Sequence, residues 1–356
     1  MPNPYVSFLV PVYNTGKYLP KCLDSLLGQT EENIEIIVVN DGSTDNSAEI
    51  LEIYRGRDTR IKVITHPRNC GLLEARITAI KFSSGRYIAH VDSDDWTEPD
   101  FAAKIVEYSD NFTYDIIAFQ FSLDFLSLRK KLLKLFELRD GRKNYVAQSC
   151  ILKNSAAIFE KYLAHEITWE SCGKAIKSSL AKSFCHSLPT GVAAGIIFSE
   201  DAIQTTFHVC HARSYRCVPD KSYHYRCGIG VTTIDFSDFD TFRTRLKNHA
   251  SALELIRLFI NETYPPFEDY QNRQFHLVFA ENLQKCLLNS ISCLPYENRC
   301  EGYSLFMECY GQKRFLSLLG EGVCYIPEEL PISHFLKYSV QYAKLFLKRN
   351  AARLKR

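Results

Sequence analysis

Apolar and polar residues follow two different patterns along the first third of the chain, one typical of strands and one typical of helices. Short apolar runs rich in β-branched and aromatic residues predict strands at Val6–Tyr13, Ile34–Asp41, Ile61–Thr65, Tyr87–Asp92 and Tyr114–Phe121. Between them, apolar residues at helical spacing predict helices at Leu19–Leu27, Ser47–Tyr54, Leu72–Phe82 and Phe101–Tyr108. Strands that alternate with helices are typical of βαβ units, so we predict an α/β fold with a largely parallel, doubly wound sheet.

The pattern changes after Phe121. Leucine and lysine at helical spacing predict an amphipathic helix at Leu126–Leu138, and Glu200 opens a further helix expected to reach Cys210. From Asp238 onward the spacing predicts successive helices at Phe242–Ile260, Tyr270–Leu288 and Gly302–Cys309. We therefore expect a domain over residues 1–235, with halves of about 1–122 and 145–235, and a helical accessory region over 236–332.

The last segment, residues 333–356, is basic and amphipathic. From Phe335 onward it carries seven lysines and arginines, interleaved with aromatic and aliphatic residues, and no acidic residue. A helix of this composition binds an anionic membrane interface, but a terminal helix that packs on its own domain has a similar pattern. Both readings stay open. No stretch approaches the ~18 uninterrupted apolar residues of a spanning helix.

Composition and charge narrow the class of protein. Among 356 residues, 46% are hydrophobic and 24% are charged, as in soluble globular proteins. The formal charge of +2 provides no global field that would select nucleic acid. The 13 cysteines are odd in number and irregularly spaced, which favours reduced thiols over a disulfide framework. The N-terminus has no basic region before its apolar run, so it is not a signal peptide, and we expect a cytoplasmic protein, which would be peripheral at the inner face of the membrane only if the basic tail binds there.

Polar clusters gather where the predicted strands end. They occur at Pro11–Asn14, Asn40–Ser43 and Asp92–Asp95. In doubly wound sheets, ligands bind outside the carboxyl ends of the strands. This polarity therefore predicts a ligand site at one edge of the sheet.

The most acidic of these clusters is Asp92-Ser93-Asp94-Asp95. Closely spaced carboxylates repel one another unless a cation is bound, which favours a hard divalent metal such as Mg²⁺ or Mn²⁺. Such an ion keeps coordination positions open for substrate phosphates. The alternative is an aspartate-rich turn that caps the following helix.

A calcium loop is a competing interpretation of the second cluster, which begins at Asp41. Acidic and hydroxyl residues follow it at the offsets of an EF-hand loop. The glycine needed at the sixth position is Asn46, however, and a strand precedes the loop where an EF-hand requires a helix. Capping of the next helix by Ser43 or Thr44 is the favoured structural role.

The order and spacing of these motifs resemble glycosyltransferase family 2, of the GT-A fold. The similar segments are Val6–Asn14, Leu23–Leu26 with Gln29-Thr30, Asn40–Asp45, Gly71–Arg76, Gly85–Ile88, Asp92–Trp96, Phe198–Asp201 and Tyr223–Arg226. The resemblance implies a mixed, Rossmann-like sheet with helices on both faces. It also implies an inverting, metal-dependent transferase of bacterial cell-surface glycan synthesis.

The resemblance also implies which residues bind the donor. Pro11, Tyr13 and Asp41 would border the nucleotide base, with Tyr13 stacking on it and Asp41 accepting from a uracil N–H, which favours UDP. Arg76 would approach the diphosphate, although a surface cation on a helix is the plainer alternative. The full set implied for the nucleotide-sugar is Pro11, Tyr13, Asn14, Asp41, Gly71, Arg76, Asp92, Ser93 and Asp94.

The resemblance also implies which residues bind the metal ion and which residue is the general base. Asp92 and Asp94 match the two acids of the family's D-x-D motif and would hold the Mn²⁺ or Mg²⁺ ion. Asp201 would be the general base and Glu200 its neighbour, which is the arrangement for a single displacement with inversion. The plainer alternative is a pair of acids favoured by the dipole of the first helical turn.

Three residues are expected near the acceptor. Trp169 is either a core residue or an acceptor platform, and Lys174 falls where the family often lines the acceptor pocket. Arg226 would contact the acceptor or a phosphate, or would form a structural salt bridge. Two positions depart from the family pattern: Asn40 stands where an acid is common, and Ile77 stands where asparagine is common.

We therefore expect transfer of a sugar from a UDP-sugar to a hydroxyl of a glycan or lipid-linked glycan, in polysaccharide or lipopolysaccharide synthesis. One alternative is a catalytically silent glycan-binding or scaffold protein with the same fold. Another is a sugar nucleotidyltransferase, against which the absence of a basic, glycine-rich first loop argues.

Overall fold

The structure is a computed structural model. It describes residues 3–125, 149–227 and 238–263, and further along the chain residues 284, 287, 288, 290, 291, 294–311 and 315. The predicted helices at Leu126–Leu138 and over most of Tyr270–Leu288, and the basic tail at 333–356, lie outside these residues. Among the described residues, no helix is long and apolar enough to cross a membrane.

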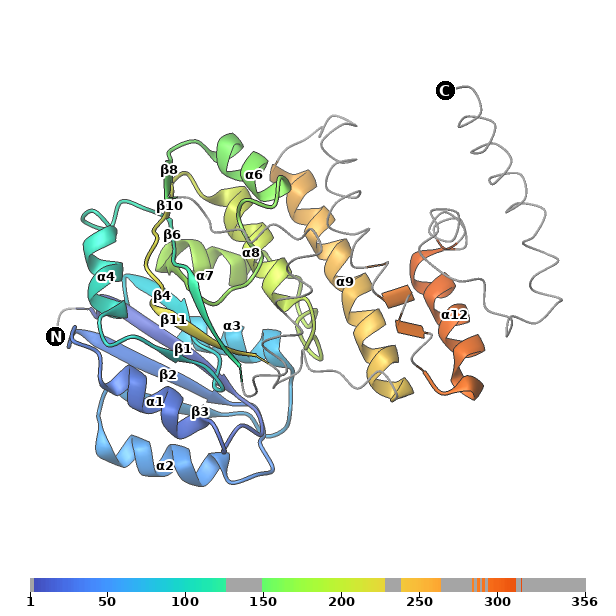
Figure 1. Ribbon diagram of the computed structural model, residues 1–356, viewed down its shortest axis with the longest axis horizontal. Coiled ribbons are helices and arrows are strands. Elements are labelled where there is room, and N and C mark those ends of the chain that lie inside the picture. Colours follow the sequence, from blue (N-terminus) through green and yellow to red (C-terminus); the bar gives the residue numbers. More distant parts are fainter. Residues whose placement is uncertain are drawn as a thin grey trace. The chain divides into compact units, whose positions relative to one another are not determined.

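An eight-stranded mixed sheet forms the centre of the fold (Figure 1). Its strand order is β3-β2-β1-β4-β9-β6-β10-β8. Strands β1 to β4 and the pair β6–β10 run parallel, whereas β9 is antiparallel to both of its neighbours and β8 is antiparallel to β10. The bounds are β1 Val6–Val12, β2 Ile34–Asn40, β3 Ile61–Thr65, β4 Tyr87–His90, β6 Ile116–Ala118, β8 Cys150–Leu152, β9 Lys174–Lys177 and β10 Tyr215–Cys217.

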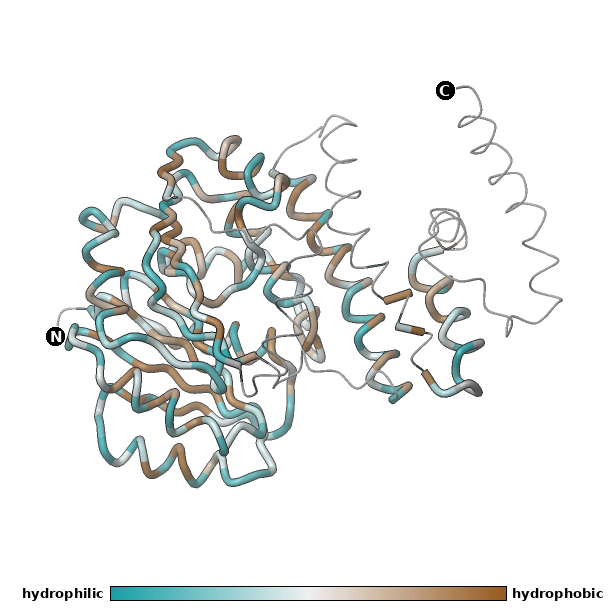
Figure 2. Tube along the Cα trace, viewed as in Figure 1, coloured by the Kyte–Doolittle hydropathy of each residue, from teal (hydrophilic) through white to brown (hydrophobic). Residues whose placement is uncertain are grey.

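Helices cover both faces of this sheet. All residues of β1 and β2 are buried, which explains why these strands are continuous apolar runs rather than alternating ones. On one face α1, α2 and α4 share a core cluster with Phe8 and Val10 of β1, and on the other α3 contacts β1, β2 and α7. Figure 2 shows hydrophobic residues concentrated along the strands. The helix bounds are α1 Leu19–Leu27, α2 Ser47–Arg57, α3 Leu72–Phe82, α4 Phe101–Tyr108, α6 Ser155–Leu163, α7 Ser178–Ser187 and α8 Glu200–His211.

A second sheet of three strands joins distant parts of the chain. It consists of β5 (Trp96–Thr97), β11 (Tyr223–Cys227) and β7 (Phe121–Phe125) in the order β5-β11-β7. Because β5 directly follows the acidic cluster, its pairing with β11 brings Tyr223 and Arg226 beside that cluster.

The predicted α/β fold is confirmed, and with it the mixed sheet that the family resemblance implied. The predicted strand Tyr114–Phe121 is corrected, because β6 ends at Ala118 and β7 begins at Phe121 in the other sheet. Between them the Phe119 N–H donates to the Gly173 carbonyl and the Gln120 N–H to the Asp220 carbonyl, which turns the chain out of the main sheet. The sheet is largely parallel, as predicted, and β9, which inserts between β4 and β6, and β8 are its antiparallel strands.

The chain divides into two compact units. The first comprises residues 1–233 and 255–266, and the second comprises 234–254 and 267–356. Helix α9 (Phe239–Thr263), which contains the predicted Phe242–Ile260, supplies residues to both. In the first unit Phe259 packs against Phe207, and in the second Phe242 and Phe306 share a core cluster. Helix α12 (Tyr296–Tyr310) contains the predicted Gly302–Cys309.

Candidate active site

The polar clusters meet at one edge of the main sheet, as the strand directions predicted. Strands β1, β2 and β4 run parallel, so the residues that follow them leave the sheet on the same side. The Thr15 hydroxyl after β1 donates to the Ser93 hydroxyl after β4 over 2.9 Å. The loops after β1 and β4 are therefore in direct contact.

The loops after β1 and β2 are interlocked through Asn14. This residue has a φ of +54°, which asparagine tolerates better than most residues. Its Oδ1 atom accepts from the Thr44 N–H over 2.8 Å, and its own N–H donates to the Ser43 hydroxyl over 3.1 Å. The Asn40 Oδ1 atom accepts from the Ser43 N–H over 3.0 Å, so a neutral amide orders the turn where the family often has an acid. Tyr13 beside this turn keeps 45% of its surface exposed.

Asp41 is buried and its carboxylate is already occupied within the protein. Oδ1 lies 2.7 Å from His66 Nδ1 and accepts from the Cys70 N–H over 2.8 Å, and Oδ2 accepts from the Gly71 N–H over 2.9 Å. Gly71 has a φ of +98°, a conformation that a residue with a Cβ rarely adopts. Asp41 thus holds the start of α3 against the end of β2. The sequence pattern did not indicate this set of partners.

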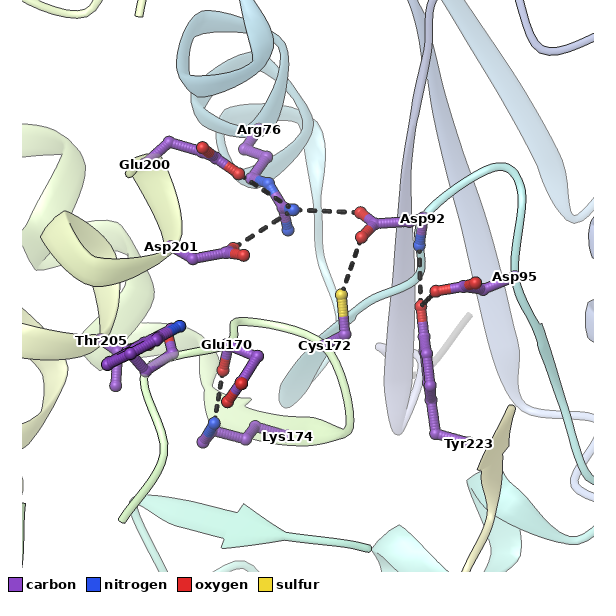
Figure 3. Close-up of polar contacts among 11 residues, drawn as sticks. Arg76, Asp92, Asp95, Glu170, Cys172, Lys174, Glu200, Asp201, Thr205 and Tyr223 are labelled. Carbon is purple, nitrogen blue, oxygen red and sulfur yellow. Dashed lines mark hydrogen bonds and ion pairs between the residues drawn. The ribbon is translucent and has the colours of Figure 1, made fainter. Parts of the chain in front are cut away.

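Arg76 on α3 is the cation at the centre of the site (Figure 3). Its side chain is buried, and its Nη2 atom lies 3.0 Å from Asp92 Oδ1, 3.3 Å from Asp201 Oδ1 and 3.6 Å from Glu200 Oε1. Burial on its own would lower the pKa of Arg76, but the carboxylates raise it well above its usual value, so the guanidinium stays charged. The plainer reading of Arg76 as a surface cation is therefore wrong.

Two other donors of this guanidinium are unused. Arg76 Nε and Nη1 are buried and have no hydrogen-bond partner among the residues that the structure describes. A buried donor without a partner is costly, and a guanidinium suits phosphate and carboxylate oxygens in pairs. These two N–H groups can therefore donate hydrogen bonds to an anionic ligand.

Glu200 and Asp201 open α8, where the helix dipole favours negative charge. They differ in access, because the side chain of Asp201 is 26% exposed and that of Glu200 is 7% exposed. Burial, together with the charge of Asp201, raises the pKa of Glu200 to about 8. Burial also raises the pKa of Asp201, and the Arg76 charge opposes that rise. Asp201 is the carboxylate that an incoming group can reach.

The acidic cluster after β4 divides into two kinds of carboxylate. Asp95 is structural, since its Oδ2 accepts from the Tyr223 hydroxyl over 2.7 Å and its Oδ1 accepts from the Arg226 N–H over 2.8 Å. Burial raises the pKa of Asp94 to about 6, and the charge of Asp92 adds to the rise. A nearby cation would relieve this cost, and carboxylate oxygens are donors that a hard divalent ion takes.

A thiol that the sequence pattern did not indicate also contacts this cluster. The Cys172 Sγ–H donates to Asp92 Oδ2 over 3.0 Å, opposite the contact with Arg76. Ligand atoms converge within 4.8 Å at Asp92, Asp95 and Cys172, and a second such group among the described residues is Asp41, His66 and Cys70. Nine of the cysteines, Cys172 among them, are free thiols. Cys172 reaches Asp92 through a fold contact, which no local sequence motif encodes.

The residues expected near the acceptor have different environments. Trp169 is 45% exposed, which excludes the core alternative. Lys174 is buried, and its Nζ atom donates to the Thr168 hydroxyl over 3.2 Å and to the Glu170 carbonyl. Arg226 donates through Nε to the Asp94 carbonyl over 2.9 Å and stacks over Trp96, while its Nη2 atom has no hydrogen-bond partner among the described residues.

The mixed sheet with helices on both faces is the GT-A fold. The sheet resembles that of Staphylococcus aureus TarS residues 1–349, whose structure was solved in complex with UDP-GlcNAc. The two chains superpose with a TM-score of 0.52 at 19% identity over 90% of this chain and 93% of the other. At this identity the likeness concerns the fold.

Residues 7–165 match the model of glycosyl transferase family 2, and this part of the chain is similar to that family.

Similar curated proteins match over the same N-terminal region. EpsH of Bacillus subtilis is 46% identical over 125 residues, which is 35% of this chain and 36% of EpsH. Glycosyltransferase GlyA of Streptococcus pneumoniae is 51% identical over 107 residues, 29% of this chain and 15% of GlyA. Chondroitin synthase of Pasteurella multocida is 41% identical over 97 residues, 27% of this chain and 10% of that enzyme. The matches therefore span about a third or less of each relative.

Proposed function

We propose that the chain transfers a sugar from a UDP-sugar to a hydroxyl group of a glycan or lipid-linked glycan, with inversion at the transferred carbon. The observation that carries this proposal is the position of Arg76, whose guanidinium lies between Asp92 of the acidic motif and Asp201 at the start of α8. In such a site the Arg76 guanidinium would lie between the donor diphosphate and the acceptor hydroxyl. The UDP-GlcNAc bound to the TarS structure supports a uridine nucleotide.

Donor binding would use the loops at the sheet edge. Exposed Tyr13 has a face available for stacking on the base, while Asn14 and Asp41 keep the surrounding turns in place. The unused Nε and Nη1 atoms of Arg76 would donate to diphosphate oxygens. In this proposal Asn14 and Asp41 maintain the shape of the donor pocket, and Arg76 binds the negatively charged diphosphate.

Asp92 and Asp94 would hold a Mn²⁺ or Mg²⁺ ion, which supplies positive charge to the departing nucleoside diphosphate when it is bound. The raised pKa of Asp94 supports this role, because a bound cation would offset the cost that burial and the Asp92 charge impose on the ionised carboxylate. Asp95 keeps its bonds to Tyr223 and Arg226 and would stay a structural residue.

Asp201 would act as the general base. It would take the proton of the acceptor hydroxyl as that oxygen forms its bond to the anomeric carbon of the donor. The bond from this carbon to the diphosphate oxygen breaks, and its electron pair leaves with the nucleoside diphosphate. The exposure of Asp201 supports it over Glu200, whose carboxyl is enclosed. A single displacement of this kind inverts the configuration.

Two further proposals concern the type of acceptor and a contact with the membrane. A lipid-linked acceptor would place the reaction at the inner face of a membrane, and the basic tail at 333–356 would bind anionic headgroups there. Deleting the tail after Ile332 should then reduce co-sedimentation with anionic vesicles. Unchanged co-sedimentation would remove the tail from this function.

The proposed function is tested by UDP release from the purified chain across a panel of UDP-sugars, with Mn²⁺ and with a chelator. Slow hydrolysis in the absence of an acceptor reports the donor. Metal-dependent turnover of one sugar is the expected result. If neither turnover nor metal-dependent UDP binding is observed, a catalytically silent glycan-binding protein becomes the better interpretation. Release of pyrophosphate from a nucleoside triphosphate would indicate a nucleotidyltransferase.

A further inference from the structure

A five-residue segment, 168–172, lies between the proposed base and the acidic motif (Figure 3), and we call it the bridging segment. At its start Trp169 is exposed, and at its end Cys172 donates to Asp92. Between them Ser171 is near enough to Asp201 to lower the pKa of that carboxyl, although its hydroxyl makes no hydrogen bond among the described residues. The segment is therefore adjacent both to the proposed base and to the acidic motif.

Buried side chains hold consecutive residues of the bridging segment from the inside. The Lys174 Nζ donates to the Thr168 hydroxyl and to the Glu170 carbonyl. The Thr205 hydroxyl on α8 donates to the Trp169 carbonyl over 2.7 Å. Lys174 and Thr205 are buried, and their polar groups are bonded to the segment itself.

The inner side of the segment leaves little room for movement. Lys174 and Thr205 line a buried cavity of about 10 Å³, which is space for one water molecule. His90 and His208 line the same cavity. With the Trp169 and Glu170 carbonyls held from the inside, the segment leaves the Trp169 side chain exposed.

We propose that Lys174 and Thr205 are positioning residues that fix the bridging segment, so that Trp169 faces the acceptor at a set distance from Asp201. Thr205 is one turn along α8 from Asp201, so the same helix carries the base and orients the tryptophan. This inference rests on the proposed function for the identity of the acceptor. In this proposal Lys174 acts on the acceptor side through the segment and not by contact.

The chain offers a matched pair of variants. Thr205→Val removes the hydroxyl that holds Trp169, with almost no change in volume. Thr206→Val makes the same change at the next buried position of α8, where the hydroxyl pairs with the Tyr162 hydroxyl over 2.8 Å and touches no part of the bridging segment. Thr205→Ser keeps the hydroxyl and should behave as the wild type.

The first readout needs no substrate. The chain has two tryptophans, so a Trp96→Phe background leaves Trp169 as the single fluorophore. We expect Thr205→Val to make Trp169 more easily quenched by acrylamide and to lower its anisotropy, whereas Thr206→Val and Thr205→Ser leave both unchanged. Unchanged quenching in Thr205→Val, or equal changes in Thr205→Val and Thr206→Val, would overturn the proposal.

The second readout separates positioning from a general loss of structure. In the wild-type background, Thr205→Val should raise the acceptor KM about fivefold, the equivalent of about 1 kcal/mol for one hydrogen bond. The affinity for UDP should stay unchanged. Lys174→Met should act in the same direction as Thr205→Val. Loss of UDP affinity in step with the KM would contradict the proposal, whereas a chain inactive with every UDP-sugar would refute the proposed function and leave the fluorescence result standing.

Discussion

The sharpest prediction concerns Asp201→Asn. The substitution keeps the shape of the side chain and removes its ability to take a proton. Loss of a general base lowers a rate by roughly 10² to 10⁴-fold, which is about 3 to 5 kcal/mol in the barrier. Arg76 keeps Asp92 at 3.0 Å and Glu200 at 3.6 Å, so the cation and its two unused donors stay in place. We therefore expect kcat to fall by this factor while the dissociation constant of UDP is nearly unchanged.

The assay is acceptor-dependent UDP release, with UDP affinity measured by calorimetry and Glu200→Gln as the matched control. Asp201 must be ionised to act, so the wild-type rate should rise with pH through the raised pKa of this carboxyl, and Asp201→Asn should lose that limb of the profile. Glu200→Gln should lower kcat far less. A loss of UDP affinity equal to the loss of rate, or a larger defect in Glu200→Gln, would refute this assignment of the base.

Glu200→Gln also tests the electrostatics in the absence of substrate. The folded-state pKa of Glu200 is about 8 against an ordinary 4.5, so folding takes up a proton between these values. The stability that this group contributes is full below pH 4.5 and is lost as the pH rises through about 8. In the Glu200→Gln variant the free energy of unfolding should fall less over this range, as measured by urea denaturation. Parallel curves for the two proteins would contradict the burial argument.

Three further predictions concern the charges around the acidic motif. Arg76→Met leaves buried carboxylates without their cation and should lower the free energy of unfolding by about 3–5 kcal/mol at neutral pH, checked by chemical denaturation. Asp94→Ala should abolish the part of UDP affinity that depends on Mn²⁺, and affinity equal to the wild type's would remove this ligand from the proposal. Tyr223→Phe leaves Asp95 short of one donor and should cost about 1–3 kcal/mol, measured by thermal unfolding beside Tyr225→Phe as the control.

The sequence was a good guide wherever local pattern decides the structure. Helices α1 and α3 begin and end at the predicted residues, and β1 and β2 differ from prediction by a single residue each. These elements are long apolar runs or clear helical repeats bounded by turn residues. The shared edge of the strand ends follows from parallel pairing alone, and so Asp41 and Asp92 were placed correctly at one edge.

The sequence was a poor guide where distant contacts decide the structure. Strand β9 has the short sequence Lys-Ala-Ile-Lys, which has no distinctive period, and it becomes a strand because β4 and β6 flank it. Lysine is usually exposed, so the burial of Lys174 was not predicted. The partners of Asp41 and the contact of Cys172 with Asp92 depend on loops that only the fold brings together.

The bonds of Asp95 have a consequence for how the protein is made. Its partners Tyr223 and Arg226 lie 128 and 131 residues further along the chain. The N-terminal part of a chain emerges from the ribosome first, so the acidic motif is synthesised long before the strand that orders it. A fragment that stops at residue 165, where the family match ends, would contain every acid of this motif and neither donor that holds Asp95 in place. Metal binding should therefore appear only in chains that extend through β11.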